Sequence, residues 1–111
     1  MTELEKRFEE DMVEKVYRTT GRETGYWAGY FLRSVKRDGG VVAAKRLLQK
    51  PGVSKGLAKL VAMNRLDLAM ETLVITPEYQ ALFTEAERAV ATKRLDEARP
   101  VASATPKDLP A

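Results

Sequence analysis

Residues 2–16 read Thr-Glu-Leu-Glu-Lys-Arg-Phe-Glu-Glu-Asp-Met-Val-Glu-Lys-Val, and the spacing of the apolar residues in this stretch indicates the fold class. Apolar side chains recur every four positions, as one face of an α-helix requires. They are Leu4, Phe8, Met12 and Val16. Thr2 and Glu5 have the spacing of a capping box, which starts a helix. The stretch predicts a first helix of about 17 residues that ends before Gly21.

Helical spacing continues along nearly the whole chain, and three of the five prolines lie after residue 99. We therefore expect an all-α protein, with a single compact multi-helix domain over residues 1–99 made of about six to seven helices, some of them short. Residues 100–111 hold almost no large apolar side chain and predict a flexible, disordered tail. Helix stop and start signals place the later helices at about 23–37, 41–49, 54–63, 66–75, 77–83 and 84–98.

The composition removes most of the usual catalytic groups. The 111 residues include no cysteine and no histidine, so thiolate nucleophiles, thiolate zinc sites and the usual neutral-pH base are absent. The best carboxylate pairs are Asp67 with Glu71 and Glu10 with Glu14, but spacing of four residues is common by chance in a chain this charged. We expect a non-enzymatic protein with no metal site and no cofactor.

The N-terminus is acidic and shows no signal-peptide pattern, and no apolar run approaches the length of about 20 residues that a membrane span needs. These features predict a soluble, cytoplasmic protein with no membrane partner.

Charge is sorted along the sequence. Between Arg33 and Arg65 there are nine lysines and arginines and one acid, Asp38, whereas the whole chain has a net charge of +3. Blocks of one sign suit a surface that meets a polyanion or an acidic partner. We predict a nucleic-acid-binding face over residues 33 to 59, formed by Arg33, Lys36, Arg37, Lys45, Arg46, Lys50, Lys55 and Lys59.

Two pairs of cations in this block, Arg46 with Lys50 and Lys55 with Lys59, have the spacing of neighbours on the outer side of a helix. Such an array suits the phosphates of a nucleic-acid backbone. The alternative is that the protein's own acidic segments, residues 1–14 and 66–87, cover these cations.

Four of the eight aromatic residues lie within six positions, at Tyr26, Trp27, Tyr30 and Phe31, just before the first cations of the block. Aromatic rings beside cations are used to hold single-stranded nucleic acids, since bases stack on the rings. Helical aromatic residues are more often part of the core, and we take that as the default. Tyr30 is the possible stacking residue, because it shares a helix face with Arg37.

Residues 48–58 resemble a helix-hairpin-helix element, in which two short helices bind the DNA backbone. Pro51-Gly52-Val53 matches the hairpin of that family and Ala58 its small packing residue. Ser54 replaces the second hairpin glycine, which lets backbone N–H groups approach a phosphate. The resemblance implies DNA-backbone binding at this turn.

A longer resemblance covers residues 26–95 and includes Gly39-Gly-Val-Val-Ala-Ala-Lys-Arg-Leu-Leu48 and Arg65-Leu-Asp-Leu-Ala-Met-Glu-Thr-Leu-Val74. This part is similar to a small helical domain of uncharacterised bacterial proteins, some encoded near restriction or phage-defence genes. The resemblance implies a helical fold and a bacterial or phage setting related to defence. It transfers no catalytic residue.

Together these features predict an accessory or adaptor domain whose basic face binds nucleic acid, either DNA or RNA without sequence preference, or a nucleoprotein partner. The alternative is a protein interaction module, or a subunit that self-associates as a homodimer through its acidic and basic blocks and its first helix. The possible interface on that helix is formed by Leu4, Phe8, Met12 and Val16.

Overall fold

The computed structural model describes residues 2–50 and 55–98. Every regular element in these two ranges is helical, so the predicted all-α fold is confirmed. The α-helices are α1 (Glu3–Asp11), α2 (Thr20–Thr24), α3 (Gly29–Asp38), α4 (Gly40–Leu48), α5 (Lys55–Ala62), α6 (Met70–Val74) and α7 (Glu85–Ala98). A π-helical segment, η1 (Met12–Thr19), and two 3-10 segments, η2 (Leu66–Leu68) and η3 (Pro77–Leu82), complete them. The predicted hairpin at 51–54 and the predicted tail lie outside the described residues.

The first helix is longer than predicted. It begins with the expected capping box, in which Thr2 Oγ1 accepts a hydrogen bond from the Glu5 N–H at 3.1 Å. It then runs without interruption through α1, η1 and α2 and ends at Gly25, whose φ of 78° favours glycine. The prediction that it ends before Gly21 is wrong, because a glycine inside a helix costs only about 1 kcal/mol and packing compensates for that cost.

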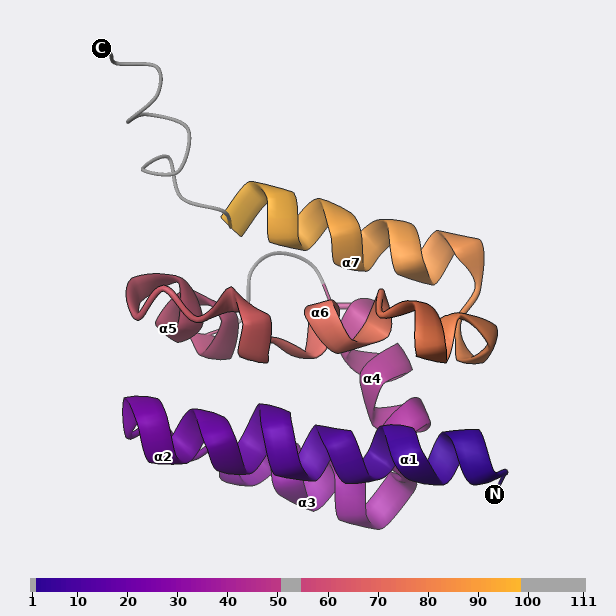
Figure 1. The fold of residues 1–111 in the computed structure, drawn as a ribbon, viewed down its shortest axis with the longest axis horizontal. Helices are drawn as coiled ribbons and strands as arrows, with labels where there is room; N and C mark the ends of the chain where they lie inside the picture. Colours follow the sequence, from indigo (N-terminus) through magenta and orange to yellow (C-terminus); the bar gives the residue numbers. More distant parts are fainter. Residues whose placement is uncertain (1, 51–54, 99–111) are drawn as a thin grey trace, which may run out of the picture.

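Figure 1 shows how the helices are arranged. The long helix formed by α1, η1 and α2 lies along one side, with α3 beside it, and α7 lies along the opposite side. The shorter helices α5 and α6 lie between these sides, and α4 runs steeply from α3 toward α6. The turn between α3 and α4 occurs at Gly39, with φ of 92°, as the two glycines predicted.

The main core is built around the apolar side of the first helix. Phe8 has no exposed surface, and its ring makes edge contacts with Tyr79 at 5.1 Å and Phe83 at 5.2 Å between ring centroids. Met12, from the next helical turn, is also fully buried. A smaller cluster under α5 is formed by Leu57, Leu60, Leu68, Ala69 and Leu95.

Two other sequence predictions differ in detail from the structure. The helix expected over 66–75 is divided at Ala69, whose ψ of 148° is extended, into η2 and α6. The helix expected to start at residue 23 starts only at Gly29. The break at Asn64 is confirmed by its φ of 58°, and the second capping box is confirmed by the hydrogen bond of 3.1 Å from the Glu87 N–H to Thr84 Oγ1.

Candidate nucleic-acid interface

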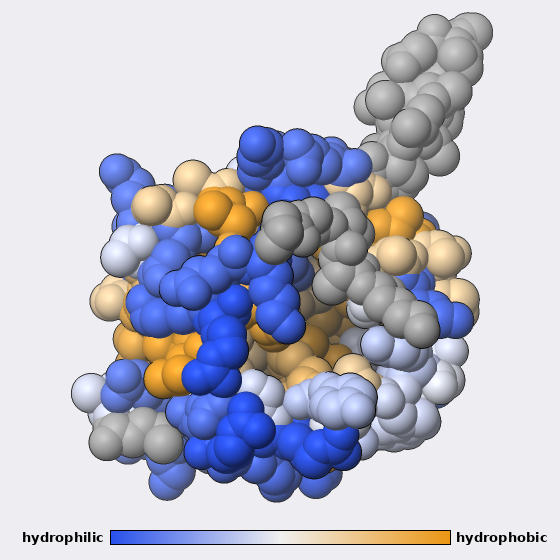
Figure 2. Space-filling model, turned by 180° about the vertical axis from the view of Figure 1, so that it is seen from behind, coloured by the Kyte–Doolittle hydropathy of each residue, from blue (hydrophilic) through white to orange (hydrophobic). Residues whose placement is uncertain are grey.

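The outer side of α3 carries a row of aromatic and basic side chains. Val35 is fully buried on the inner side, so the helical period leaves Tyr30, Arg33 and Arg37 on the opposite side. Lys36 lies next to them, is exposed, and has no ion-pair partner among the described residues. Figure 2 views the molecule from the side on which α3 lies. Hydrophilic side chains gather there along the lower edge of the molecule. The row gives this side of the helix a strong positive charge.

Tyr30 and Arg33 form a defined pair within this row. The guanidinium carbon of Arg33 lies 4.5 Å from the centroid of the Tyr30 ring, a cation–π contact. Tyr30 nevertheless retains 85% of its surface exposed to solvent. Arg33 therefore occupies only part of the Tyr30 surface, and much of the ring is open.

Asp38 connects the cations of α3 with those of α4. Its Oδ2 lies 2.9 Å from Arg37 Nη2 and 2.6 Å from Arg46 Nη1. The hydrogen bond from Arg37, followed by that from Arg46, lowers the pKa of Asp38 to about 2. The one acid of the basic block thus brings two predicted site residues together at the corner between the helices.

Lys45 does not belong to the exposed basic face. Its Nζ lies 2.7 Å from Glu87 Oε1 and 5.3 Å from the centroid of the Phe83 ring. Burial by itself raises the pKa of Glu87, but hydrogen bonds from Lys45 and Thr84 lower the pKa overall. The prediction for Lys45 is corrected, because packing of α4 against α7 places its ammonium beside a carboxylate.

The predicted cations that follow along the chain do not lie on one helix. Lys50 is exposed just beyond the end of α4. Lys59 is exposed on α5, which packs mainly on α2, η2 and α7, so these contacts do not place it with the α3 row. The Lys55 side chain lies outside the described part of the structure, and its predicted pairing with Lys59 stays a prediction.

The acidic first helix does not cover the basic block. Among the described residues, no carboxylate of α1 forms an ion pair with a cation of residues 33–59. Arg7 and Glu78 form an ion pair with each other, and Glu9 accepts a hydrogen bond of 3.1 Å from the Gly40 N–H. In the described part of the chain, the acidic segments therefore neutralise only some of the cations of the basic block, and none of those on α3.

The possible interface on the first helix is also corrected. Phe8 and Met12 are fully buried in the protein's own core, and Leu4 and Val16 are partly buried against it. Exposing a side chain such as Phe8 to reach a partner would cost about 1.5–3 kcal/mol. Phe8 and Met12 therefore serve the protein's own core.

Trp27 is the aromatic residue whose position sequence reasoning missed. It is 51% exposed, although aromatic residues in this segment were expected to be core. Its ring makes an edge contact with Tyr17, at 5.4 Å between centroids, and lies directly over Gly21. The glycine within the helix was the available signal, since a residue without a side chain provides room for a neighbouring ring.

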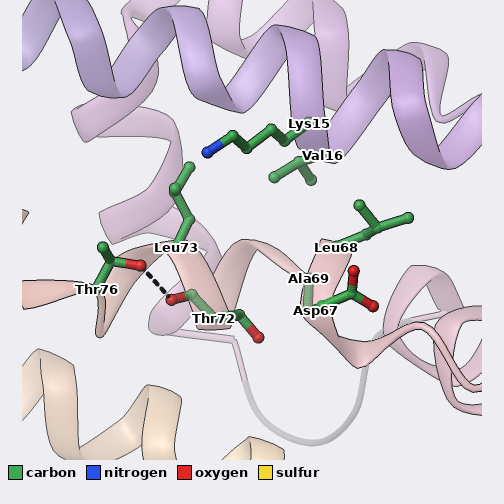
Figure 3. Close-up of a pocket in the computed structure, with 8 residues that line it drawn as sticks. All are labelled: Lys15, Val16, Asp67, Leu68, Ala69, Thr72, Leu73 and Thr76. Atoms are coloured by element: carbon green, nitrogen blue, oxygen red, sulfur yellow. Dashed lines mark hydrogen bonds between the residues drawn. The ribbon is translucent and has the colours of Figure 1, made fainter.

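A small cavity of about 90 Å³ lies between η1 and the segment from η2 to α6. Figure 3 shows Lys15 and Val16 on one side of it and Asp67, Thr72 and Thr76 on the other. Both threonine hydroxyls are already used, since Thr72 donates to the Leu66 carbonyl at 2.7 Å and Thr76 to the Thr72 carbonyl at 2.9 Å. This cavity is smaller than small-molecule sites, which usually measure about 300–1,000 Å³.

Of the two carboxylate pairs suggested by the sequence, Asp67 with Glu71 does not converge in the structure. Asp67 pairs with Arg65 at 3.0 Å, whereas Glu71 turns inward to Arg94 at 3.3 Å. No group of three or more acidic residues among the described residues has the arrangement of a metal site.

Comparison with protein-family models, with curated proteins and with solved structures finds no match to this chain. The two resemblances drawn from the sequence therefore stay predictions. None of the described helices has the length and apolar character needed to cross a membrane.

Proposed function

We propose that this protein is a non-enzymatic accessory domain that binds the phosphate backbone of nucleic acids, alone or within a nucleoprotein. The basic surface is formed by Arg33, Lys36, Arg37 and Arg46, and we name it the α3 surface. Lys50 is a further exposed cation just beyond the end of α4. Because the contacts are made to phosphates, sequence preference is slight.

The observation that carries this proposal is that two neighbouring cations of α3, Arg33 and Lys36, lack the carboxylate partners that Lys45 and Arg65 have. Lys45 and Arg65 are neutralised by carboxylates from other elements, Glu87 for Lys45 and Glu23 for Arg65. Arg33 and Lys36 have no carboxylate partner in the described part of the chain. Unpaired cations on one helix face repel each other, and a polyanion relieves that repulsion.

Asp38 does not remove Arg37 and Arg46 from this surface. It accepts hydrogen bonds from Nε and Nη2 of Arg37 and from Nη1 of Arg46. A guanidinium has five N–H donors, so each arginine keeps donors for a phosphate oxygen. Asp38 thereby holds two arginines at the α3–α4 corner with donors still available.

Binding of a labelled duplex and a labelled single strand, measured by fluorescence anisotropy at increasing salt, tests the proposal. Contacts to about three phosphates give a slope of about −3 for the logarithm of the duplex binding constant against the logarithm of salt concentration. We expect the double variant Arg33→Glu, Lys36→Glu to lose most of the binding.

The matched control is the double variant Lys6→Glu, Lys93→Glu. It changes net charge by the same amount, at two exposed lysines on α1 and α7 that have no ion-pair partner among the described residues. We expect it to bind nearly as the wild type does. Absent binding, binding that is insensitive to salt, or equal losses in the two variants would overturn the proposal.

A further inference from the structure

Two large aromatic side chains are exposed at the start of α3, close in the sequence to the first cation of the α3 surface. Trp27 lies in the loop that precedes α3, and Tyr30 lies in its first turn. Their exposed fractions are 51% and 85%. Leaving aromatic surface in water forgoes the free energy that burial would provide, so two such residues next to a cation cluster indicate a binding surface.

Trp27 is held in a fixed position. One part of its ring lies on the backbone of α2 at Gly21, where any Cβ would overlap the ring atoms. The two rings of Trp27 and Tyr17, the latter from η1, make an edge contact. The helix thus supports one side of the indole, and the rest of the ring is open to solvent, which is the arrangement of a platform for a planar ligand.

Tyr30 is positioned in a different way. Arg33, one turn later on α3, lies over the Tyr30 ring. The Nη1 atom of Arg33 also lies near Gly29, at 3.6 Å from the position that a Cβ would occupy there. Arg33 therefore folds back along the helix and is held beside an open aromatic ring. A planar base on Tyr30 and a phosphate on Arg33 can be bound together, because ring and guanidinium present different groups.

We infer that Trp27 and Tyr30 stack on the bases of single-stranded nucleic acid while the α3 surface binds its phosphates. This inference rests on the proposed function and specifies the class of nucleic acid. In a duplex the faces of the bases are covered by their neighbours, and only an unpaired strand offers them to aromatic rings. Single strands are therefore bound more tightly than duplexes of the same length.

The fluorescence of Trp27 provides a direct measurement, since it is the single tryptophan of the chain. We expect an unlabelled single-stranded oligodeoxynucleotide of mixed sequence to quench this fluorescence on binding, and the matching duplex to leave it nearly unchanged. The Tyr30→Ala variant should weaken single-strand binding by about fivefold or more and leave duplex binding as it was. Trp27→Leu, followed by anisotropy of a labelled strand, should act in the same way.

The control variant is Met63→Ala, which removes an apolar side chain of similar exposure, 48%, away from α3. We expect its affinity for both probes to equal that of the wild type. Equal, salt-dependent binding of strand and duplex without quenching would overturn the stacking inference and leave the proposed function intact. Binding of neither probe would overturn both. A strand-specific loss in Met63→Ala as large as that in Tyr30→Ala would also contradict stacking.

Discussion

Glu71 and Arg94 form an ion pair in the interior, with Oε2 of Glu71 3.3 Å from Nη1 of Arg94. Their residue exposures are 4% and 8%, so both charges are almost removed from water. The Nη2 group of Arg94 also donates to the carbonyl oxygens of Leu48 and Lys50. One side chain of α7 thereby holds α6 and the end of α4 in place.

Removal of Arg94 alone should destabilise the fold severely. The Arg94→Leu variant leaves the Glu71 carboxylate buried without its partner and two carbonyls without their donor. We expect the free energy of unfolding to fall by about 3–5 kcal/mol, measured by urea denaturation. In the double variant Glu71→Leu, Arg94→Leu much of this loss should be recovered, because no charge is left unpaired. Equal losses in the single and double variants would contradict this explanation.

Acid should weaken the contact between α3 and α4 at Asp38. The folded-state pKa of about 2 lies below the ordinary value of 3.8, so the ionised carboxylate favours the folded state. This contribution is present above about pH 4 and is lost as the pH falls toward 2. Thermal unfolding of the wild type and of Asp38→Asn should show a difference in stability that shrinks over this range. Because Asp38 is accessible to solvent, added salt should also reduce the difference. A difference that is constant with pH would exclude this role.

Alkali should act on the buried hydroxyl of Tyr79, which donates to Asp11 Oδ2 at 2.5 Å. Burial, together with this hydrogen bond, raises the pKa of Tyr79 from 10.0 to about 12. The folded state favours the protonated phenol, so its contribution is present below pH 10 and is lost between pH 10 and 12. Tyrosinate absorbance should show one of the four tyrosines titrating last. The late phase should disappear in Tyr79→Phe; a late phase that persists there would assign it to another tyrosine.

A methyl group at Gly21 should displace Trp27. Alanine is favoured over glycine in a helix by about 1 kcal/mol, but its Cβ would overlap the indole ring. We expect Gly21→Ala to shift the tryptophan emission toward that of an indole in water, and to weaken single-strand binding. Gly29→Ala is the control, because its new Cβ would meet only Arg33 at an ordinary contact distance of 3.6 Å. Unchanged emission in Gly21→Ala would contradict the position of the Trp27 ring over Gly21.

Local signals in the sequence predicted much of the fold. The two capping boxes, the glycine stop at Gly39 and the break at Asn64 all depend on residues close together in the chain, and all are confirmed. The end of the first helix was placed wrongly because the decisive neighbour of Gly21, Trp27, lies after the turn. No comparable local signal in the sequence indicated the break at Ala69, which separates η2 from α6.

The same contrast holds for the candidate site, where features that depend on sequence neighbours could be predicted and contacts made by packing could not. Local spacing could place Arg33, Lys36 and Arg37 on a helix and on one side of it, since the period of an α-helix depends on the backbone alone. It could not show that Lys45 meets Glu87, because these residues are brought together by packing of α4 on α7.

The amino-acid sequence by itself determined the helical class, most helix ends and the position of the positive charge along the chain, because these depend on neighbours within a few residues. Tertiary structure alone decided which cations are neutralised and which aromatic rings face water. Phe8 is buried whereas Trp27 is exposed, although both are large aromatic residues. Burial and ion pairing depend on which helices pack together, and that packing is established only when the whole chain folds.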